Sequence, residues 1–169
     1  MDSSASPIDI SKTWFRLIRT VQIDSFRHTK IFKAYTDFLW AWLSLIFFIK
    51  HYAGSEKVNI KNLSKSLSDT QLKSILTTPV MDQIHELSKL KIANMDPRDG
   101  HDPMEENNAL ETALKSSNER DIFRSTMLLL YVVRCNLFHG DKSWTVSRDN
   151  QIVYHSQKLL VSILDKLLV

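Results

Sequence analysis

The chain has 169 residues and a mass of 19.6 kDa, with 43% of its residues apolar and 24% charged. This length and composition allow one domain with a buried core. Three glycines and four prolines are too few for a sheet protein dense in tight turns or for a glycine-rich phosphate loop, so the composition favours an all-α fold. The single cysteine excludes an intramolecular disulfide and a zinc site made only of thiolates, and it fits a reducing, intracellular setting.

The formal net charge of +3 is unevenly distributed along the chain. Residues 94–108 hold five acids and one base, a net charge of −4, which leaves +7 on the remaining 154 residues. A basic body of this kind can attract a phosphate backbone with an affinity that depends on salt. Charge alone therefore makes nucleic acid one candidate partner.

The sequence predicts no membrane association. Its longest apolar stretch, residues 38–49, has 12 residues, whereas a helix needs about 20 to span a bilayer. The polar and acidic residues 1–9 do not resemble a signal peptide. We expect a cytoplasmic protein in which residues 38–49 form a helix that is buried on most sides.

Apolar residues at helical spacing predict a series of helices separated by capping and turn residues. We expect residues 1–22 to form an N-terminal arm or a short helix, and the spacing at 11–21 makes an amphipathic helix plausible there. The apolar side of that helix consists of Trp14, Leu17, Ile18 and Val21. The main domain, residues 23–169, opens with a long aromatic-rich helix that ends at Gly54. We expect the four aromatic residues from Phe32 to Trp40 in the core rather than on a surface that stacks bases.

Later helices are expected on both sides of the acidic loop at 94–108. A short helix follows Ser68, with Pro79 beyond its end. Further helices are expected at 80–94, 108–115 (one or two turns), 119–140 and 150–168. The prediction is an all-α bundle of five or six helices.

Two candidate sites are weak. The acidic loop contains Asp96, Asp99 and Asp102, and clustered carboxylates suit hard cations. Its spacing does not match a calcium-binding loop, so we interpret it as a surface turn and predict no metal or cofactor. Cys135 has only His139 nearby as a base, and we favour a buried structural thiol over a nucleophile.

The strongest signal is the segment 131–143, YVVRCNLFHGDKS, at the C-terminal end of a predicted helix. Arg134 offers a permanent planar cation for a phosphodiester, and His139 can transfer protons near neutral pH. The two residues are about 140° apart around a regular helix, so they converge only if the helix loosens before Gly140. The alternative is that both simply cap the negative end of the helix dipole.

At these residues the sequence resembles the HEPN family, which comprises compact all-α domains with an Arg-x4-6-His motif. Arg134-Cys-Asn-Leu-Phe-His139 has the Arg-x4-His form. The order of an aromatic-rich first helix, a motif at the end of a late helix and a closing helix is similar over most of residues 24–168. The resemblance implies a HEPN-like bundle that acts as a homodimer, with the two motifs facing each other across the interface.

The resemblance also implies a metal-independent endoribonuclease with a role as a toxin or in phage defence. His139 would transfer the proton of the ribose 2′-OH or of the leaving 5′-oxygen, and Arg134 would bind the scissile phosphate. The products would be 2′,3′-cyclic phosphate and 5′-hydroxyl ends. The family often has a polar residue directly after the arginine; here Cys135 takes that place and Asn136, the candidate assisting residue, follows. We add Lys142 as a candidate phosphate contact.

Two alternatives remain open at the level of sequence. The first is a non-catalytic HEPN module that dimerises, or binds nucleotide or RNA, together with a partner such as an antitoxin or a nucleotidyltransferase. The second is a structural helical bundle in which Arg134 and His139 only cap a helix.

Overall fold

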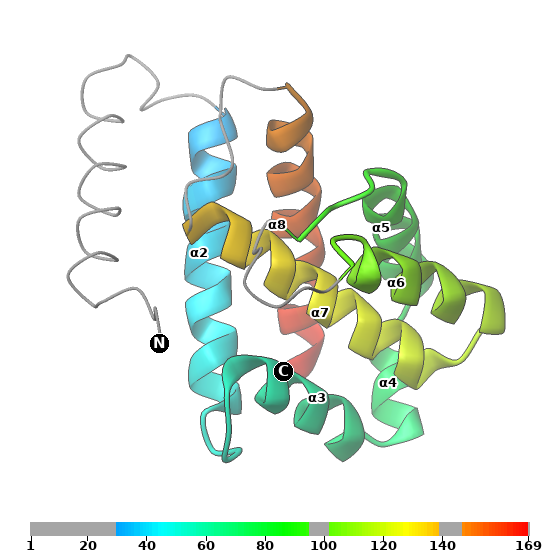
Figure 1. Cartoon of the computed structure of the whole chain (residues 1–169). Helices are drawn as coiled ribbons and strands as arrows, with labels where there is room; N and C mark the ends of the chain where they lie inside the picture. The colour runs from blue at the N-terminus through cyan, green and yellow to red at the C-terminus, as the bar shows by residue number, and fades with distance from the viewer. Residues whose placement is uncertain (1–29, 95–101, 139–146, 169) are drawn as a thin grey trace.

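The computed structural model describes residues 30–94, 102–138 and 147–168, which form seven α-helices and no strand (Figure 1). The helices are α2 (Lys30–Ile49), α3 (Glu56–Ser66), α4 (Asp69–Ile75), α5 (Thr78–Lys89), α6 (Glu105–Ser116), α7 (Glu119–Phe138) and α8 (Ser147–Leu167). The prediction of an all-α bundle is confirmed, with one helix, α3, that the sequence pattern did not predict. The predicted arm over residues 1–22 lies outside the described residues.

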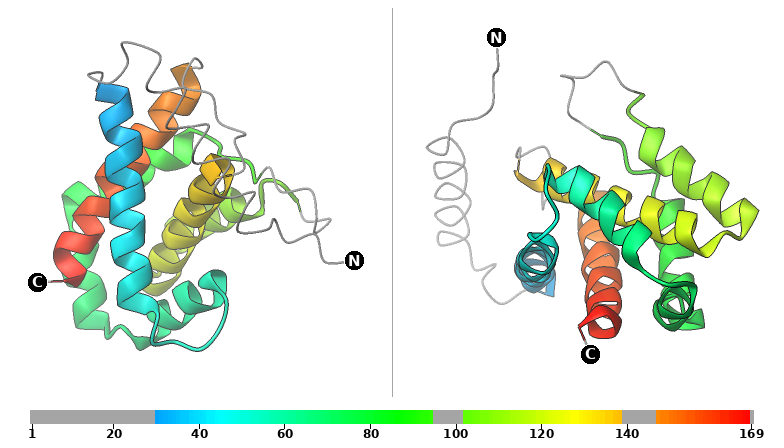
Figure 2. Two further views of the ribbon diagram at one scale, coloured as in Figure 1. Left: turned by 90° about the vertical axis from the view of Figure 1, so that its left-hand side faces the viewer. Right: turned by 90° about the horizontal axis from the view of Figure 1, so that it is seen from below.

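Helices α2 and α8 lie side by side along most of their length (Figures 1 and 2). Consecutive helices α6 and α7 pack as an antiparallel pair, α3 lies against α7, and α5 lies against α8. The inward faces of these helices share one apolar core, as layers of packed helices require. Phe38, Trp42 and Phe123 are among its largest fully buried side chains.

Helix α2 is buried on one side only, which corrects the expectation that residues 38–49 are buried on most sides. Phe38, Trp42 and Leu45 are at most 2% exposed. Trp40 and Phe47 are 66% and 67% exposed, so Trp40 is not the core residue that we expected. Helix α2 has one buried and one exposed side, although 15 of its 20 residues are apolar. No helix in the described ranges is both long and apolar enough to cross a membrane.

A glycine turn joins α2 to α3. Helix α2 ends at Ile49, and Gly54 takes a φ of 142° in the turn, which side chains rarely allow. A Cβ at Gly54 would lie 2.8 Å from Cγ1 of Val58. Ser55 then caps α3 by accepting a hydrogen bond from the backbone N–H of Val58. Gly54 therefore directs the chain into α3 rather than directly terminating α2.

Capping residues mark the starts of α4 and α7, and a proline marks the start of α5. Ser68 and Gln71 form a capping box at α4, and Pro79 lies in the first turn of α5, where its missing N–H costs no helical bond. The side-chain oxygen of Asn118 accepts a hydrogen bond from the first turn of α7. These starts lie within two residues of the predicted ones, because capping is encoded locally.

The region between α5 and α8 departs from the predicted boundaries. Helix α5 ends at Lys89 rather than at residue 94, and Lys91 has a left-handed φ of 51°. Arg148 of α8 holds this turn by donating from Nη2 to the carbonyls of Leu90 (3.0 Å) and Lys91 (2.7 Å). Helix α8 begins three residues earlier than predicted, and α6 has 12 residues rather than one or two turns.

Arg120 fixes the register of α3 on α7. Its Nη1 donates to the carbonyls of Ser64 (2.6 Å) and Leu67 (2.7 Å) at the C-terminal end of α3, and its Nη2 pairs with Asp69 (2.8 Å). Because this contact joins the end of α3 to the start of α7, the first residue of α3, Glu56, lies beside the last turns of α7.

Candidate functional site

The last turns of α7 carry the first half of the Arg-x4-His segment. Arg134 and Asn136 belong to the described part of α7, which ends at Phe138. His139 and Lys142, the other two predicted site residues, lie outside the described residues. The described part of the candidate site therefore consists of Arg134 and the residues that surround it.

The guanidinium of Arg134 is held from two sides. Its Nη2 lies 3.4 Å from Oε2 of Glu56, and its Cζ lies 4.3 Å from the ring centroid of Phe138, one turn further along α7. Its Nε is buried and has no hydrogen-bond partner among the described residues. The side chain is 28% exposed. A planar cation held by one carboxylate and one aromatic face, and still partly open to solvent, is suited to bind a phosphate.

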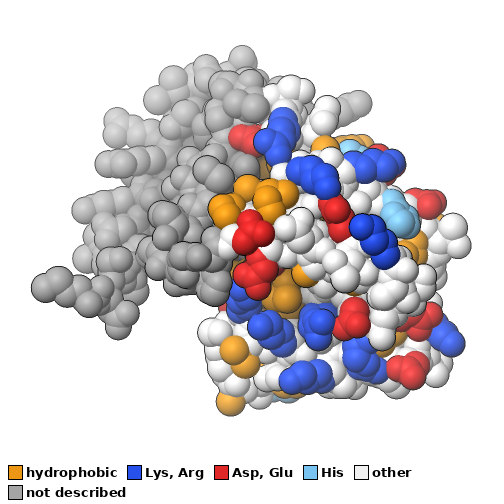
Figure 3. All heavy atoms as spheres, turned by 45° about the vertical axis from the view of Figure 1, so that its right-hand side comes forward, with side chains coloured by type: hydrophobic (Ala, Val, Ile, Leu, Met, Phe, Trp, Pro, Cys, Tyr) orange, Lys and Arg blue, Asp and Glu red, His pale blue; other side chains and the backbone are white. Residues whose placement is uncertain are grey.

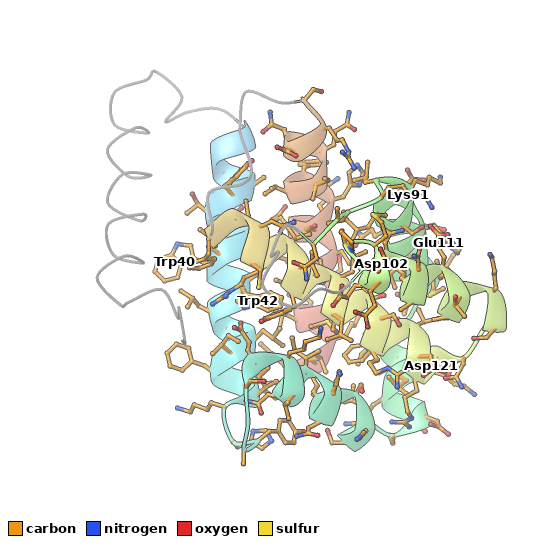
Figure 4. All side chains as sticks on the ribbon, viewed as in Figure 1. Trp40, Trp42, Lys91, Asp102, Glu111 and Asp121 are labelled. Atoms are coloured by element: carbon orange, nitrogen blue, oxygen red, sulfur yellow. The ribbon has the colours of Figure 1, made fainter. Side chains whose placement is uncertain are left out.

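Glu56 links three helices at this point. Its Oε1 accepts a hydrogen bond from Nε1 of Trp42 in α2, while its Oε2 pairs with Arg134 in α7. Trp42 points from α2 into the bundle (Figure 4), where its ring lies 6.3 Å from that of Tyr131. Sequence analysis missed Glu56. The only local signal was a Ser-Glu pair that begins a helix, and that pair does not reveal a contact with α7.

Asn136 lies on a different side of α7 from Arg134, since residues two apart differ by about 200° around a helix. It is 1% exposed, and its Nδ2 donates to the carbonyl of Ala93 at 2.8 Å. The N–H of the preceding Ile92 donates to Oδ1 of Asn107 (3.1 Å). The two asparagines thus hold the chain between α5 and α6, and the structure does not bring Asn136 together with Arg134.

The Cys135 thiol is partly buried beside Arg134. Burial raises the pKa of Cys135 above its usual value of 9.0, against the opposing effects of Tyr131 and Arg134. Burial likewise raises the pKa of Tyr131. A neutral thiol is a poor nucleophile, so this setting favours a packing role for Cys135 over a catalytic one.

Three lysines lie along α3. Lys57 pairs with the buried Glu106 at the start of α6 (2.9 Å), and Lys61 and Lys65 are exposed at successive four-residue steps along α3. Residues four apart share one side of a helix, so these lysines form a stripe on α3. On the face in Figure 3, basic and acidic side chains are interspersed, with more basic ones in its lower half.

Among the residues that the structure describes, no three histidine, cysteine or acidic side chains lie together as metal ligands. Asp96 and Asp99 of the acidic loop lie outside that part of the chain, and Asp102 accepts hydrogen bonds from the N–H of Met104 and the side chain of Asn108.

Comparison of the chain with protein-family models, curated proteins and solved structures found no match.

Proposed function

We propose that the protein is a metal-independent endoribonuclease of HEPN type that acts in the cytoplasm as a toxin or in phage defence. The observation that most supports this proposal is the partly exposed guanidinium of Arg134, oriented by Glu56 and Phe138 directly before the segment that contains His139. Metal-independent cleavage of a phosphodiester uses an oriented cation together with a residue that transfers protons.

In the proposed reaction, Arg134 binds the scissile phosphate and stabilises the negative charge that develops on it. His139 accepts the proton of the ribose 2′-OH, the 2′-oxygen attacks phosphorus, and the bond between phosphorus and the 5′-oxygen breaks. The leaving 5′-oxygen takes a proton from a second acid, which a homodimer supplies as the His139 of the other copy. The products are a 2′,3′-cyclic phosphate and a 5′-hydroxyl.

The lysine stripe on α3 supports RNA as the substrate. Lys57, which is paired with Glu106, and the exposed Lys61 and Lys65 extend over nine residues, or about 12 Å of helix. The stripe begins beside Glu56, at the end of α3 that contacts Arg134, and extends from there along α3 away from Arg134. Basic side chains at this spacing can contact successive phosphates of a single strand. Lys142, outside the described residues, is a further candidate phosphate contact.

The proposal is tested by incubating the purified chain with varied RNAs in EDTA and analysing the ends produced. We expect cyclic-phosphate and 5′-hydroxyl ends from the wild type and none from His139→Ala or Arg134→Ala. His85→Ala, which alters an exposed histidine on α5, is the matched control and should cleave normally. If the wild type is inert on all RNAs, or if His139→Ala cleaves equally well, the enzyme proposal is wrong.

The ion pair between Arg134 and Glu56 favours a second candidate function. Because a carboxylate already compensates the guanidinium charge, Arg134 would stabilise the charge of a transition state less, which favours a non-catalytic HEPN module that dimerises, or binds nucleotide or RNA, with a partner such as an antitoxin or nucleotidyltransferase. Equal RNA binding by wild type and His139→Ala, without cleavage by either, would support this second function over the enzyme. A sedimentation mass near 19.6 kDa rather than twice that value would argue against the homodimer in both candidates.

A further inference from the structure

Two lysines of α3, Lys61 and Lys65, have no part in holding the fold together. The other charged residues of the helix, Glu56 and Lys57, are already paired with α7 and α6. Both Lys61 and Lys65 are exposed, and the ammonium group of neither pairs with an acid among the described residues. Helix α3 therefore presents two uncompensated positive charges to solvent.

The spacing of the two lysines matches that of phosphates on a nucleic-acid strand. They are four residues apart, which is about 6 Å along the helix axis with a turn of about 40° around it. Neighbouring phosphates of a single strand have a similar separation, so each ammonium group can contact one of them. Figures 1 and 3 differ by a turn about the vertical axis, and α3 lies at the level of Figure 3 where basic side chains predominate over acidic ones.

The position of these lysines relative to Arg134 is fixed by contacts at both ends of α3. The first residue of α3, Glu56, pairs with Arg134, and the carbonyls at the other end of α3 accept hydrogen bonds from Arg120. Helix α3 therefore lies antiparallel on α7. Lys61 and Lys65 follow Glu56 by about 7.5 Å and about 13.5 Å along the α3 axis. A strand bound at Arg134 can continue along α3 and reach both lysines.

We propose that α3 is a backbone-binding subsite, in which Lys61 and Lys65 bind two successive phosphates of an RNA strand on one side of the phosphate at Arg134. The identity of the ligand rests on the proposed function, whereas the site rests on the placement of the lysines. An acidic protein fits this surface less well. Val58, 43% exposed, is the one exposed large apolar side chain of α3, which is too little for the apolar centre of a protein interface.

The test is the binding of an RNA octamer with 2′-O-methyl groups, which cannot be cleaved through its 2′-oxygen. Its affinity is measured by fluorescence anisotropy over a series of salt concentrations. Each lost phosphate contact should reduce the slope of log affinity against log salt by about 0.7, so Lys61→Gln with Lys65→Gln should reduce it by about 1.4. The matched control is Lys158→Gln with Lys166→Gln, which removes two exposed lysines of α8 and should leave the slope unchanged.

Three results would overturn the subsite. These are an unchanged slope in the α3 variant, an equal reduction in the α8 control, and no salt-dependent binding of the octamer by the wild type. All four lysines are exposed, so both variants should keep the urea midpoint of the wild type. RNA cleavage by the wild type with an unchanged slope in the α3 variant would refute the subsite alone. Binding that depends on α3, without cleavage by the wild type, would refute the enzyme proposal alone.

Discussion

The carboxylate of Glu56, at the first position of α3, forms an ion pair with the guanidinium of Arg134, in the last turns of α7, with Oε2 3.4 Å from Nη2. Both side chains are more than two-thirds buried, so the pair is shielded from solvent more than an ordinary surface salt bridge. The orientation of the predicted catalytic arginine therefore depends on a helix that lies far from it in sequence. That dependence can be tested without knowledge of the substrate sequence.

Glu56→Gln removes the negative charge of the Glu56 side chain and keeps its size and shape. A glutamine oxygen can still accept the hydrogen bond from Trp42, while the ion pair with Arg134 is lost. We expect kcat/KM for RNA cleavage to fall about tenfold, equivalent to about 1.4 kcal/mol, and the free energy of unfolding to fall by about 1 kcal/mol. Glu86→Gln, which removes an exposed pair with Lys89, is the control. Unchanged cleavage by Glu56→Gln, in a wild type that is active, would contradict a positioning role.

Asn136→Ala should reduce stability because it leaves the carbonyl of Ala93 without its side-chain donor. Removing one partner of a buried hydrogen bond costs about 1–3 kcal/mol, measured here as the free energy of unfolding in urea. Asn108→Ala, which removes an exposed contact with Asp102, should cost less than about 0.5 kcal/mol. If the two variants are equally stable, Asn136 is not the structural anchor that its burial indicates.

Alkaline pH should destabilise the fold. Burial, with a smaller contribution from Asp149, raises the pKa of Tyr35 to about 12, above its usual value of 10.0. A pKa raised by folding contributes stability that is complete below the unfolded value and is lost as pH rises toward the folded value. We therefore expect the urea midpoint to decline between pH 10 and 12. Tyr35→Phe should make that decline shallower, and an identical decline in the variant would exclude Tyr35 as its source.

The Cys135 thiol should be unreactive in the folded protein. Because burial raises its pKa above 9.0, little thiolate exists at pH 8. We expect a thiol reagent such as a disulfide dye to react at least about tenfold more slowly in buffer than in unfolding urea at the same pH. Comparable rates in the two conditions would contradict this prediction and reopen a nucleophilic role for Cys135.

Gly54→Ala should destabilise the turn between α2 and α3. The φ of 142° disfavours any side chain, and the added Cβ would lie 2.8 Å from Cγ1 of Val58. We expect a loss of about 1–3 kcal/mol in the free energy of unfolding. Adding Val58→Ala removes Cγ1 but leaves the Cβ of residue 58 at 3.1 Å and the backbone strain, so the double variant should recover only part of the loss. Full recovery would show that the backbone at Gly54 is not strained.

Helices with strong local signals were predictable. The starts of α4 and α7 are set by Ser68 and Asn118, residues that bond to their own helix and so are visible in sequence. Helix α3 was missed because its buried apolar side consists mainly of Ile60 and Leu63, set among lysine, serine and asparagine. Its stability depends on packing against α7 and on Arg120, which caps it from that helix. Such contacts have no periodic signature in one sequence.

The sequence by itself determined that the chain is helical and which segment carries Arg134 and Asn136, because residue spacing and capping act over a few positions. Only the tertiary structure decided what surrounds them. It pairs Arg134 with Glu56 and turns Asn136 toward Ala93, and it exposes Trp40 while burying Trp42. The physical reason is that orientation and burial depend on which surfaces meet, and those surfaces come from helices distant in the chain.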